Sequence, residues 1–261
     1  MQRKPSSLAV IRSVGRVTFV EIVRDKVLYN SVLCALLLMG AAYLASRLSF
    51  TRPERIVIDF GLTVINVASA LIAIFIGAPM LSKEFERRTI FVALSKPISR
   101  FQFLLGKYCG LMGVITVNWL LLFGCYMAIL YFVGGHPSAT LVWGVFLLLI
   151  QTFLIAAIAI LFSAFSTASI SAMFTIGLYL LGNNITQIRF VAAKTEVSFM
   201  KNMLNTAAVI LPNMEYFNLG TKVTYALPIS GQEAAMSLAY GVVMVCAVLA
   251  FSGLLIQKKD F

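Results

Sequence analysis

The clearest chemical pattern in this chain is a charged stretch, EFERRTIFVALSKPISRFQFLLGK, at residues 84–107, with apolar segments on both sides. Glu84 and Arg88 stand four residues apart, a spacing that favours an ion pair on one face of a helix. A membrane enzyme acting on lipid would instead need a cluster of His, Asp or Glu near one interface, and the sequence shows none. The stretch therefore predicts binding of a partner and not catalysis.

The order of residues in this stretch predicts a helix, a break and a second helix. The first helix is expected from Ser82 and ends before Pro97, because proline lacks a backbone N–H and blocks the preceding turn. Ser99 and Gln102 have the spacing of a capping box, so a second helix begins there. Residues 82–103 are therefore expected to form a rigid elbow. An ordinary charged loop is the alternative that the residues alone leave open.

Other residue types that could bind a ligand are scattered. The four cysteines lie in apolar segments without a close pair, and the lone His136 falls in a short turn, so no metal site is expected. Among the amide side chains inside apolar segments, five are candidates either to hydrogen-bond neighbouring helices or to line a substrate route: Asn66, Asn118, Gln151, Asn183 and Asn184.

The apolar composition requires a membrane to position these residues. The chain is 60% hydrophobic and 12% charged, with a mean hydropathy of +0.93, which is more apolar surface than a soluble domain buries. A helix of about 20 residues crosses a ~30 Å hydrocarbon core. The sequence predicts an all-α integral membrane protein, a single domain over 1–261, with six transmembrane helices at 28–46, 57–81, 104–133, 140–163, 168–187 and 235–257.

The distribution of positive charge predicts the orientation. With six spans, both termini and residues 82–103 lie on one side, which holds 14 of the 21 Lys and Arg residues. The positive-inside rule places that side in the cytoplasm, and we expect a bacterial cytoplasmic (inner) membrane. The net charge of +11 follows from this orientation signal and from attraction to anionic membrane lipid, so no nucleic-acid partner is expected.

Two further segments are expected to lie along membrane surfaces. Residues 8–26 predict an amphipathic helix on the inner surface, either wedged between lipid and protein or serving as a simple anchor. Its apolar side is expected to comprise Leu8, Ile11, Gly15, Phe19 and Ile22, while Val10, Val17 and Val20 interrupt the polar side. Residues 188–234 predict interfacial helices at the outer surface, with Tyr216, Phe217 and Tyr225 as aromatic anchors in the headgroup zone.

The amino-acid sequence of the charged stretch resembles the signature of type-2 ABC transporter permeases. That signature has an acidic residue, a Thr, an apolar pair, Pro-x-Ser-Arg and Gly-Lys. The matching residues here are Glu84, Thr89, Pro97, Ser99, Arg100, Gly106 and Lys107. Arg88 stands where many relatives have Gly, which makes the helix stiffer. Within the family, the sequence of this stretch is most similar to permeases associated with maturation of multicopper enzymes such as nitrous-oxide reductase. Residues 211–218 (LPNMEYFN) contribute to that similarity.

The resemblance implies a division of labour between subunits. The chain has no G-x-x-x-x-G-K-[ST] phosphate loop, so ATP and Mg would bind a separate ABC ATPase, and this chain would be no enzyme and hold no cofactor. Two ATPase copies would dock on a homodimer of the chain. The residues expected to couple it to the ATPase are Glu84, Phe85, Glu86, Arg87, Arg88, Thr89, Pro97, Ser99, Arg100 and Lys107. Charge reversal at Glu84 or Arg87 is expected to leave the fold intact and to lower ATPase activity.

Two functions follow from these expectations. The first is the permease of an exporter, whose substrate is expected to be hydrophobic or lipid-like because the spans contain almost no ionisable residues. The second is a mechanical subunit that passes ATP-driven movement to a periplasmic partner in metalloenzyme maturation or in the envelope. A copper role does not follow from the resemblance, because the chain has no cluster of copper ligands.

Overall fold

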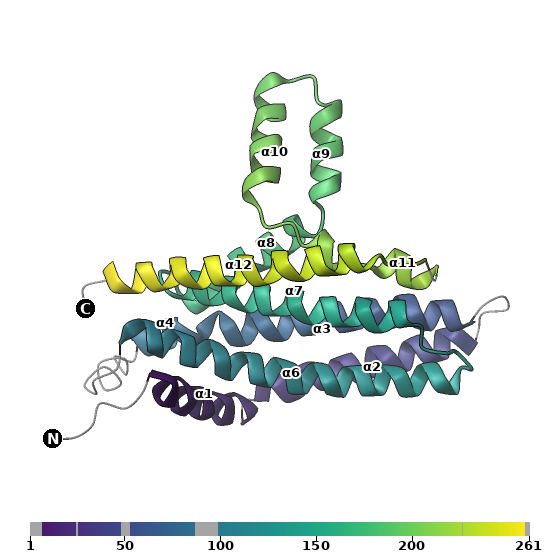
Figure 1. The fold of residues 1–261 in the computed structure, drawn as a ribbon, viewed down its shortest axis with the longest axis horizontal. Coiled ribbons are helices and arrows are strands. Elements are labelled where there is room, and N and C mark those ends of the chain that lie inside the picture. The colour runs from purple at the N-terminus through teal and green to yellow at the C-terminus, as the bar shows by residue number, and fades with distance from the viewer. Residues whose placement is uncertain (1–6, 25, 48–52, 87–98, 226, 259–261) are drawn as a thin grey trace.

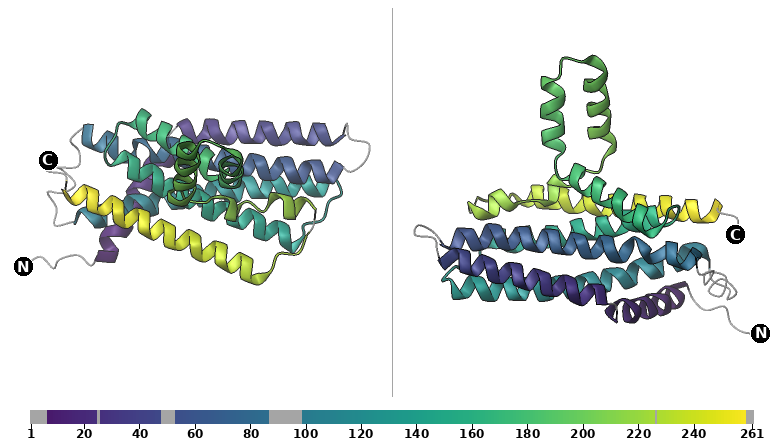
Figure 2. Two further views of the ribbon diagram at one scale, coloured as in Figure 1. Left: turned by 90° about the horizontal axis from the view of Figure 1, so that it is seen from above. Right: turned by 180° about the vertical axis from the view of Figure 1, so that it is seen from behind.

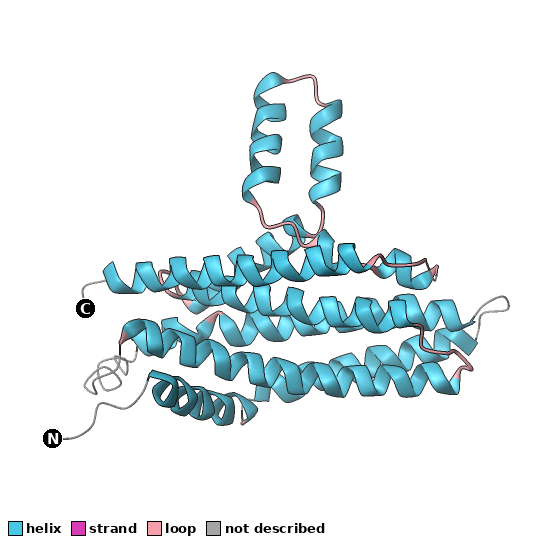
Figure 3. Ribbon diagram, in the orientation of Figure 1, coloured by secondary structure: helices cyan, strands magenta, loops and turns pink. Residues whose placement is uncertain are grey.

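The computed structural model describes residues 7–24, 26–47, 53–86, 99–225 and 227–258 (Figure 1). Every regular element in these ranges is a helix, so the predicted all-α class is confirmed for this part of the chain (Figure 3). In chain order the helices are α1 (Ser7–Val23), α2 (Lys26–Arg47), α3 (Pro53–Gly77), α4 (Pro79–Glu86), α6 (Arg100–Phe132), α7 (Ala139–Ser163), α8 (Ala168–Gly182), α9 (Ile185–Lys194), α10 (Ser198–Ile210), the 3-10 helix η1 (Glu215–Phe217), α11 (Gly220–Thr224) and α12 (Gly231–Lys258).

The long helices run side by side in a bundle centred on α3 and α7 (Figures 1 and 2). In the most apolar windows of these two helices 72% of the residues are buried, against 28% in α12, which lies at the periphery. Small residues let the two central helices approach closely, since a Cβ built on Gly77 would lie 2.9 Å from the Cβ of Ala159. We call the end where α1 begins and α12 ends the terminal end, and the opposite end, which carries α11, the far end.

Within the described residues, four helical segments are long and apolar enough to cross a membrane. They are Glu54–Glu86, Arg100–Phe132, Ala139–Ser163 and Gly231–Gln257, and they correspond to the second, third, fourth and sixth predicted spans. The first predicted span lies in α2, where several side chains are outside the described residues, and it stays a prediction. The count of six spans is therefore not confirmed.

The fifth predicted span, 168–187, is not a continuous helix. α8 ends at Gly182 and α9 follows at a bend of 68°. The amide Nδ2 of Asn183 donates to the Tyr179 carbonyl at 2.9 Å, and that of Asn184 donates to the Leu180 carbonyl at 2.8 Å. Asparagine side chains that bond to the backbone in this way compete with continuation of a helix. The pair of helices makes a fifth crossing only if the bent pair is taken as one span.

Helices α9 and α10 form an antiparallel hairpin, residues 185–210, which we call the lateral arm. It leaves the side of the bundle between the two ends and projects steeply away from the long axis (Figures 1 and 2). Its exposed apolar side chains are Phe190, Val191, Val197, Phe199, Met200, Met203, Val209 and Ile210. Helices were expected in this region, and their position relative to a membrane surface stays a prediction.

The segment after the lateral arm is anchored to α12. The backbone N–H of Asn213 donates to the hydroxyl of Tyr240 at 2.8 Å, and the hydroxyl of Ser237 donates to the Tyr216 carbonyl at 2.8 Å. Phe217 is completely buried, so its expected place as an anchor in the headgroup zone is wrong. Its ring packs near Tyr240 in the protein core, where burial of an aromatic side chain is strongly favourable. Tyr216, by contrast, is exposed.

Helix α1 packs along the first half of α6 and is not a free surface anchor. Gly15 and Ile22 are buried in this contact as expected, but Leu8 is exposed and Val10 is buried. The side of α1 that is covered by protein therefore differs from the expected apolar side at these two positions. Hydropathy does not identify the covered side, because the glycine face of α6 determines it.

Candidate coupling site

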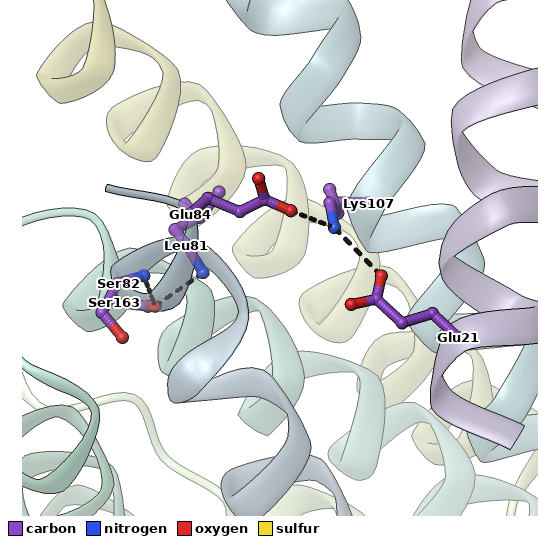
Figure 4. Close-up of polar contacts among 6 residues, drawn as sticks. All are labelled: Glu21, Leu81, Ser82, Glu84, Lys107 and Ser163. Carbon is purple, nitrogen blue, oxygen red and sulfur yellow. Dashed lines mark hydrogen bonds and ion pairs between the residues drawn. The ribbon is translucent and has the colours of Figure 1, made fainter. Parts of the chain in front are cut away.

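The first helix of the predicted elbow starts earlier than expected. α4 starts at Pro79 and not at Ser82, because proline lacks the N–H that would continue α3 and is well suited to the first helical position. The first turn of a helix leaves N–H groups without partners. Here the buried hydroxyl oxygen of Ser163, at the end of α7, accepts hydrogen bonds from Leu81 N and Ser82 N, both at 3.0 Å (Figure 4). A side chain from a different helix thus caps α4.

Lys107 joins α4 and α1 to α6. Its Nζ lies 2.8 Å from Glu84 Oε1 and 3.5 Å from Glu21 Oε2 (Figure 4). The Lys107 side chain is 8% exposed and that of Glu84 is 20% exposed, whereas Glu21 is 65% exposed. An ion pair is screened less in a buried position, so the bond to Glu84 is the strong one and Glu21 adds little. The ammonium also lies 5.8 Å from the centroid of the Phe103 ring.

Close backbone contact brings α1 to Lys107. Gly106 and Gly110 form a G-x-x-x-G pattern on α6, which is typical of tightly packed membrane helices. A Cβ built on Gly106 would lie 2.6 Å from the Cβ of Val14, and one built on Gly110 would lie 2.6 Å from the carbonyl oxygen of Gly15. Larger residues at these positions would push α1 away. The glycines therefore set the distance at which Glu21 reaches Lys107.

The start of α6 is tied to both ends of the chain. The predicted capping box is confirmed, with Ser99 Oγ accepting from Gln102 N at 3.2 Å and Gln102 Oε1 accepting from Ser99 N at 3.1 Å. The Nε2 of Gln102 donates to Ser7 Oγ at 2.9 Å. Arg100 Nη1 donates to the carbonyl of Ile256 at 2.8 Å, and a cation at a helix C-terminus also favours the helix dipole.

These contacts join five helices, α1, α4, α6, α7 and α12, at the terminal end of the bundle. We call this set the coupling site and define it by Ser7, Glu21, Ser82, Glu84, Ser99, Arg100, Gln102, Lys107 and Ser163. Its ion pairs and caps hold α4 against the first turns of α6. The arrangement can transmit a displacement of α4 to α6, and it offers no nucleophile and base in contact within the described residues.

The structure places the predicted coupling residues unequally. Glu84 and Lys107 meet, Ser99 and Arg100 hold the start of α6, and Phe85 packs partly buried against the core. Glu86 is exposed at the end of α4. Arg87, Arg88, Thr89 and Pro97 lie outside the described residues, and with them the expected pair between Glu84 and Arg88. Lys107 is buried, so it positions helices and does not present a surface to a partner.

Sequence reasoning missed Glu21 and Ser163. Glu21 carried a signal, since it is a carboxylate in a segment whose other charges are mainly basic. Ser163 carried none, because a serine at the end of an apolar helix has many possible roles. Its partners are 82 and 81 residues away in the chain, at Leu81 and Ser82.

Three of the five predicted pathway amides meet in the middle of the bundle. Gln151 Nε2 donates to Asn183 Oδ1 at 3.0 Å. Asn183 Nδ2 donates to the carbonyl of Tyr179, whose hydroxyl donates to Asn66 Oδ1 at 3.4 Å. We call these four residues the polar track. Gln151 is fully buried, and its Oε1 has no hydrogen-bond partner in the described part of the chain.

The other two amides lie apart from the polar track. Asn184 Nδ2 bonds to its own helix at Leu180, as described above. Asn118 lies on α6 and lines an apolar groove between α2 and α6. Its buried Oδ1 likewise has no partner among the described residues. The five amides thus form two groups: Asn66, Gln151 and Asn183 belong to the polar track, and Asn118 and Asn184 lie apart from it.

No group of three or more His, Cys, Asp or Glu side chains that could hold a metal ion occurs within the described ranges.

Comparison with known proteins gives the family. No curated protein matches the chain. The family model described as ABC-2 family transporter protein matches residues 17–261. The chain therefore belongs to the ABC-2 family, as a multi-pass membrane (permease) subunit of an ABC transporter, not itself the ATPase, that works with an ABC ATPase.

Proposed function

We propose that this chain is the permease of an exporter for a hydrophobic or lipid-like substrate, and that the coupling site receives the movement of the ATPase. The observation that carries the proposal is the buried contact between Lys107 and Glu84 at 2.8 Å, which ties α4 to α6. Lys83 and Glu86 on α4 are exposed, so this short helix presents charge to a partner while its other side is held by the bundle. Helix α1 forms the second wall of the dock.

The geometry supports a lever mechanism. α6 has 33 residues, which corresponds to about 50 Å at ~1.5 Å per residue. A push on α4 passes through the ion pair and the capped start of α6 along this whole length. Arg100 passes the same movement to the end of α12. The helices that move together would thus be α4, α6 and the peripheral α12.

The proposed assembly is a homodimer with two ATPase copies in a bacterial inner membrane. The peripheral helices support it, because exposed apolar side chains of α12 and of the lateral arm would face lipid or the second copy. The terminal end would lie in the cytoplasm, where ATP and Mg bind the ATPase subunits. This chain would bind no cofactor.

A second candidate function is mechanical transmission to a periplasmic partner. The lateral arm favours it, since a hairpin of two helices with exposed apolar side chains is suited to contact another protein. In that case the same coupling site would drive the arm, and transport would not occur. Under this proposal the chain would belong to the subgroup of permeases associated with metalloenzyme maturation.

The coupling proposal is tested by charge reversal at Glu86. Glu84 is unsuitable because reversal there would bury like charges beside Lys107. Glu86→Lys leaves the packing intact and places a positive charge on the proposed docking face. The chain is purified from native membranes together with its bound ATPase subunit, and the rate of ATP hydrolysis of the purified complex is measured. We expect a loss of roughly tenfold, since juxtaposed like charges cost more than the ~1.4 kcal/mol that corresponds to a factor of ten.

The matched control is Glu54→Lys, in the first turn of α3. Glu54 is an exposed carboxylate of the same helical segment, Glu54–Glu86, at the opposite end of the bundle. It should retain the ATPase activity of the unaltered chain. Equal activity in both variants would overturn the assignment of α4 as the dock.

A further inference from the structure

A polar pocket lies near the far end of the bundle, between α3, α7 and the segment around α11. Its volume is about 230 Å³, and its polar lining includes Asp59, Thr63 and Asn66 of α3 together with Asn218. The three α3 residues stand at i, i+4 and i+7, so they share one face of the helix. We call this cavity the far-end pocket. It has no part in the coupling site, which lies at the terminal end.

The oxygens around the far-end pocket are acceptors with spare capacity. Asp59 Oδ1 accepts one hydrogen bond from Thr224 at 3.5 Å, and Asn218 Oδ1 accepts one from Gly220 N at 3.1 Å. Asn66 Oδ1 accepts one from Tyr179. A carboxylate has about four acceptor positions and an amide oxygen has two, so each of these groups can accept another bond.

The carboxylate of Asp59 has no ion-pair partner within 4.0 Å among the described residues. Arg55 lies one helical turn away, but its guanidinium stands over the ring of Tyr225, 5.6 Å from the centroid, and it does not line the pocket. The far-end pocket therefore carries negative charge in a chain whose net charge is +11. Asp59 is exposed, so its carboxylate is accessible to a ligand.

The polar track continues from this pocket toward the middle of the bundle. Gly144 and Leu148 line the pocket, and Gln151 follows them on the same face of α7, one turn deeper. Asn66 belongs to both the pocket and the polar track. The unpartnered Oε1 of Gln151 lies at the deep end of this track. A fully buried amide oxygen without a partner is costly, and a donor that moves along the track would satisfy it.

We propose that the far-end pocket binds the primary ammonium group of an amphiphilic substrate. The inference rests on the proposed exporter function and names the chemical class of its substrate. A primary ammonium has three N–H donors, which suit the oxygens of Asp59, Asn66 and Asn218. A quaternary ammonium has none and is held by aromatic rings, and none of the described residues that line the pocket is aromatic.

The rest of the pocket suits an aliphatic chain attached to the amine. Leu62, Leu148 and Val223 form its apolar wall. The volume is below the roughly 300 Å³ at which ligand pockets for whole drug-sized molecules begin, so the pocket fits a headgroup and not an entire lipid. Two sources offer this chemistry, an aminophospholipid headgroup and a free alkylamine.

The test compares two cationic ligands with the same alkyl chain, one with three N–H groups on the nitrogen and the other with three methyl groups. n-Hexylamine and hexyltrimethylammonium are titrated into the purified full chain in detergent, with binding heat as the readout. We expect hexylamine to bind at least about tenfold more tightly, since hydrogen bonds to charged groups contribute enough for such a factor. Asp59→Asn, which keeps the shape of the side chain, should lose this preference. Glu54→Gln, on the same helix outside the pocket, should keep it.

The source is distinguished by a competition with lysophosphatidylethanolamine and lysophosphatidylcholine of equal chain length. If the ethanolamine lipid displaces hexylamine and the choline lipid does not, the ligand is a lipid headgroup. If neither displaces it, the ligand is a free amine. Equal binding of hexylamine and hexyltrimethylammonium, or an Asp59→Asn variant that binds like the unaltered chain, would overturn the proposal. The assay needs no ATPase, so Glu86→Lys should bind normally, and failure here would leave the coupling test standing.

Discussion

Replacing Lys107 with methionine removes the charge that joins α1, α4 and α6 while keeping an unbranched side chain in a buried position. The Glu84 carboxylate, only 20% exposed, then loses the Lys107 ammonium at 2.8 Å. Breaking a buried ion pair by removing one partner costs about 3–5 kcal/mol, because the remaining charge loses the opposite charge beside it. We therefore expect the free energy of unfolding of Lys107→Met to fall by about 3 kcal/mol, or about two orders of magnitude in the folding equilibrium.

The exposure of the two carboxylates gives a ranking that the same experiment can check. Glu84→Gln leaves Lys107 with Glu21, at 3.5 Å, as its ion-pair partner among the described residues and should cost nearly as much as Lys107→Met. Glu21→Gln removes a side chain that is 65% exposed, and exposed pairs contribute below about 1 kcal/mol. The double variant Lys107→Met with Glu84→Met should recover most of the loss, because apolar replacement of a whole buried pair is often neutral.

The assay is denaturant unfolding of the purified chain in detergent, followed by tryptophan fluorescence. Trp119 is a suitable probe because it is buried and its Nε1 donates to the carbonyl of Val145 at 3.2 Å. The reasoning would be refuted if Glu21→Gln destabilised the chain as much as Glu84→Gln. A double variant less stable than Lys107→Met alone would equally contradict it, since the charges would then contribute through partners other than each other.

Two further predictions concern helix contacts. Gly110→Ala should weaken the contact of α1 with α6 and lower the free energy of unfolding by roughly 1–3 kcal/mol, because the new Cβ would lie 2.6 Å from the carbonyl oxygen of Gly15. Gly124→Ala on the same helix meets nothing within 4 Å and should be neutral or stabilising in the same denaturant assay. Phe199→Ser on the lateral arm should leave unfolding unchanged but weaken homodimer formation by roughly tenfold in sedimentation experiments, since exposed aromatic anchors dominate interfaces. Phe132→Ser, equally exposed at the end of α6, is the control, and equal dimer formation in both variants would exclude the arm from the interface.

Sequence alone was sufficient where the determining residues are close together in the chain. The apolar segments predicted four helices that the structure contains, and the spacing of Ser99 and Gln102 predicted the capping box that starts α6. Both depend on interactions within a few residues. The motif that runs from Glu84 to Lys107 likewise indicated the family, because its residues are close together in the sequence. The bend after Gly182 was missed although Asn183 and Asn184 signalled it, because hydropathy outweighed the capping tendency of asparagine.

The tertiary structure alone decided what these residues contact. Lys107 meets Glu84 across 23 residues and Glu21 across 86, and Ser163 caps α4 across about 80. Such pairs depend on which helix faces meet, and α6 and α7 are apolar on nearly all sides, so periodicity gives no preferred face. The glycines of α6 and the central packing of α3 with α7 select those faces. The sequence therefore determined a membrane protein with a charged segment between two apolar ones, and the packing of its helices decided that a buried lysine joins α4 and α1 to α6.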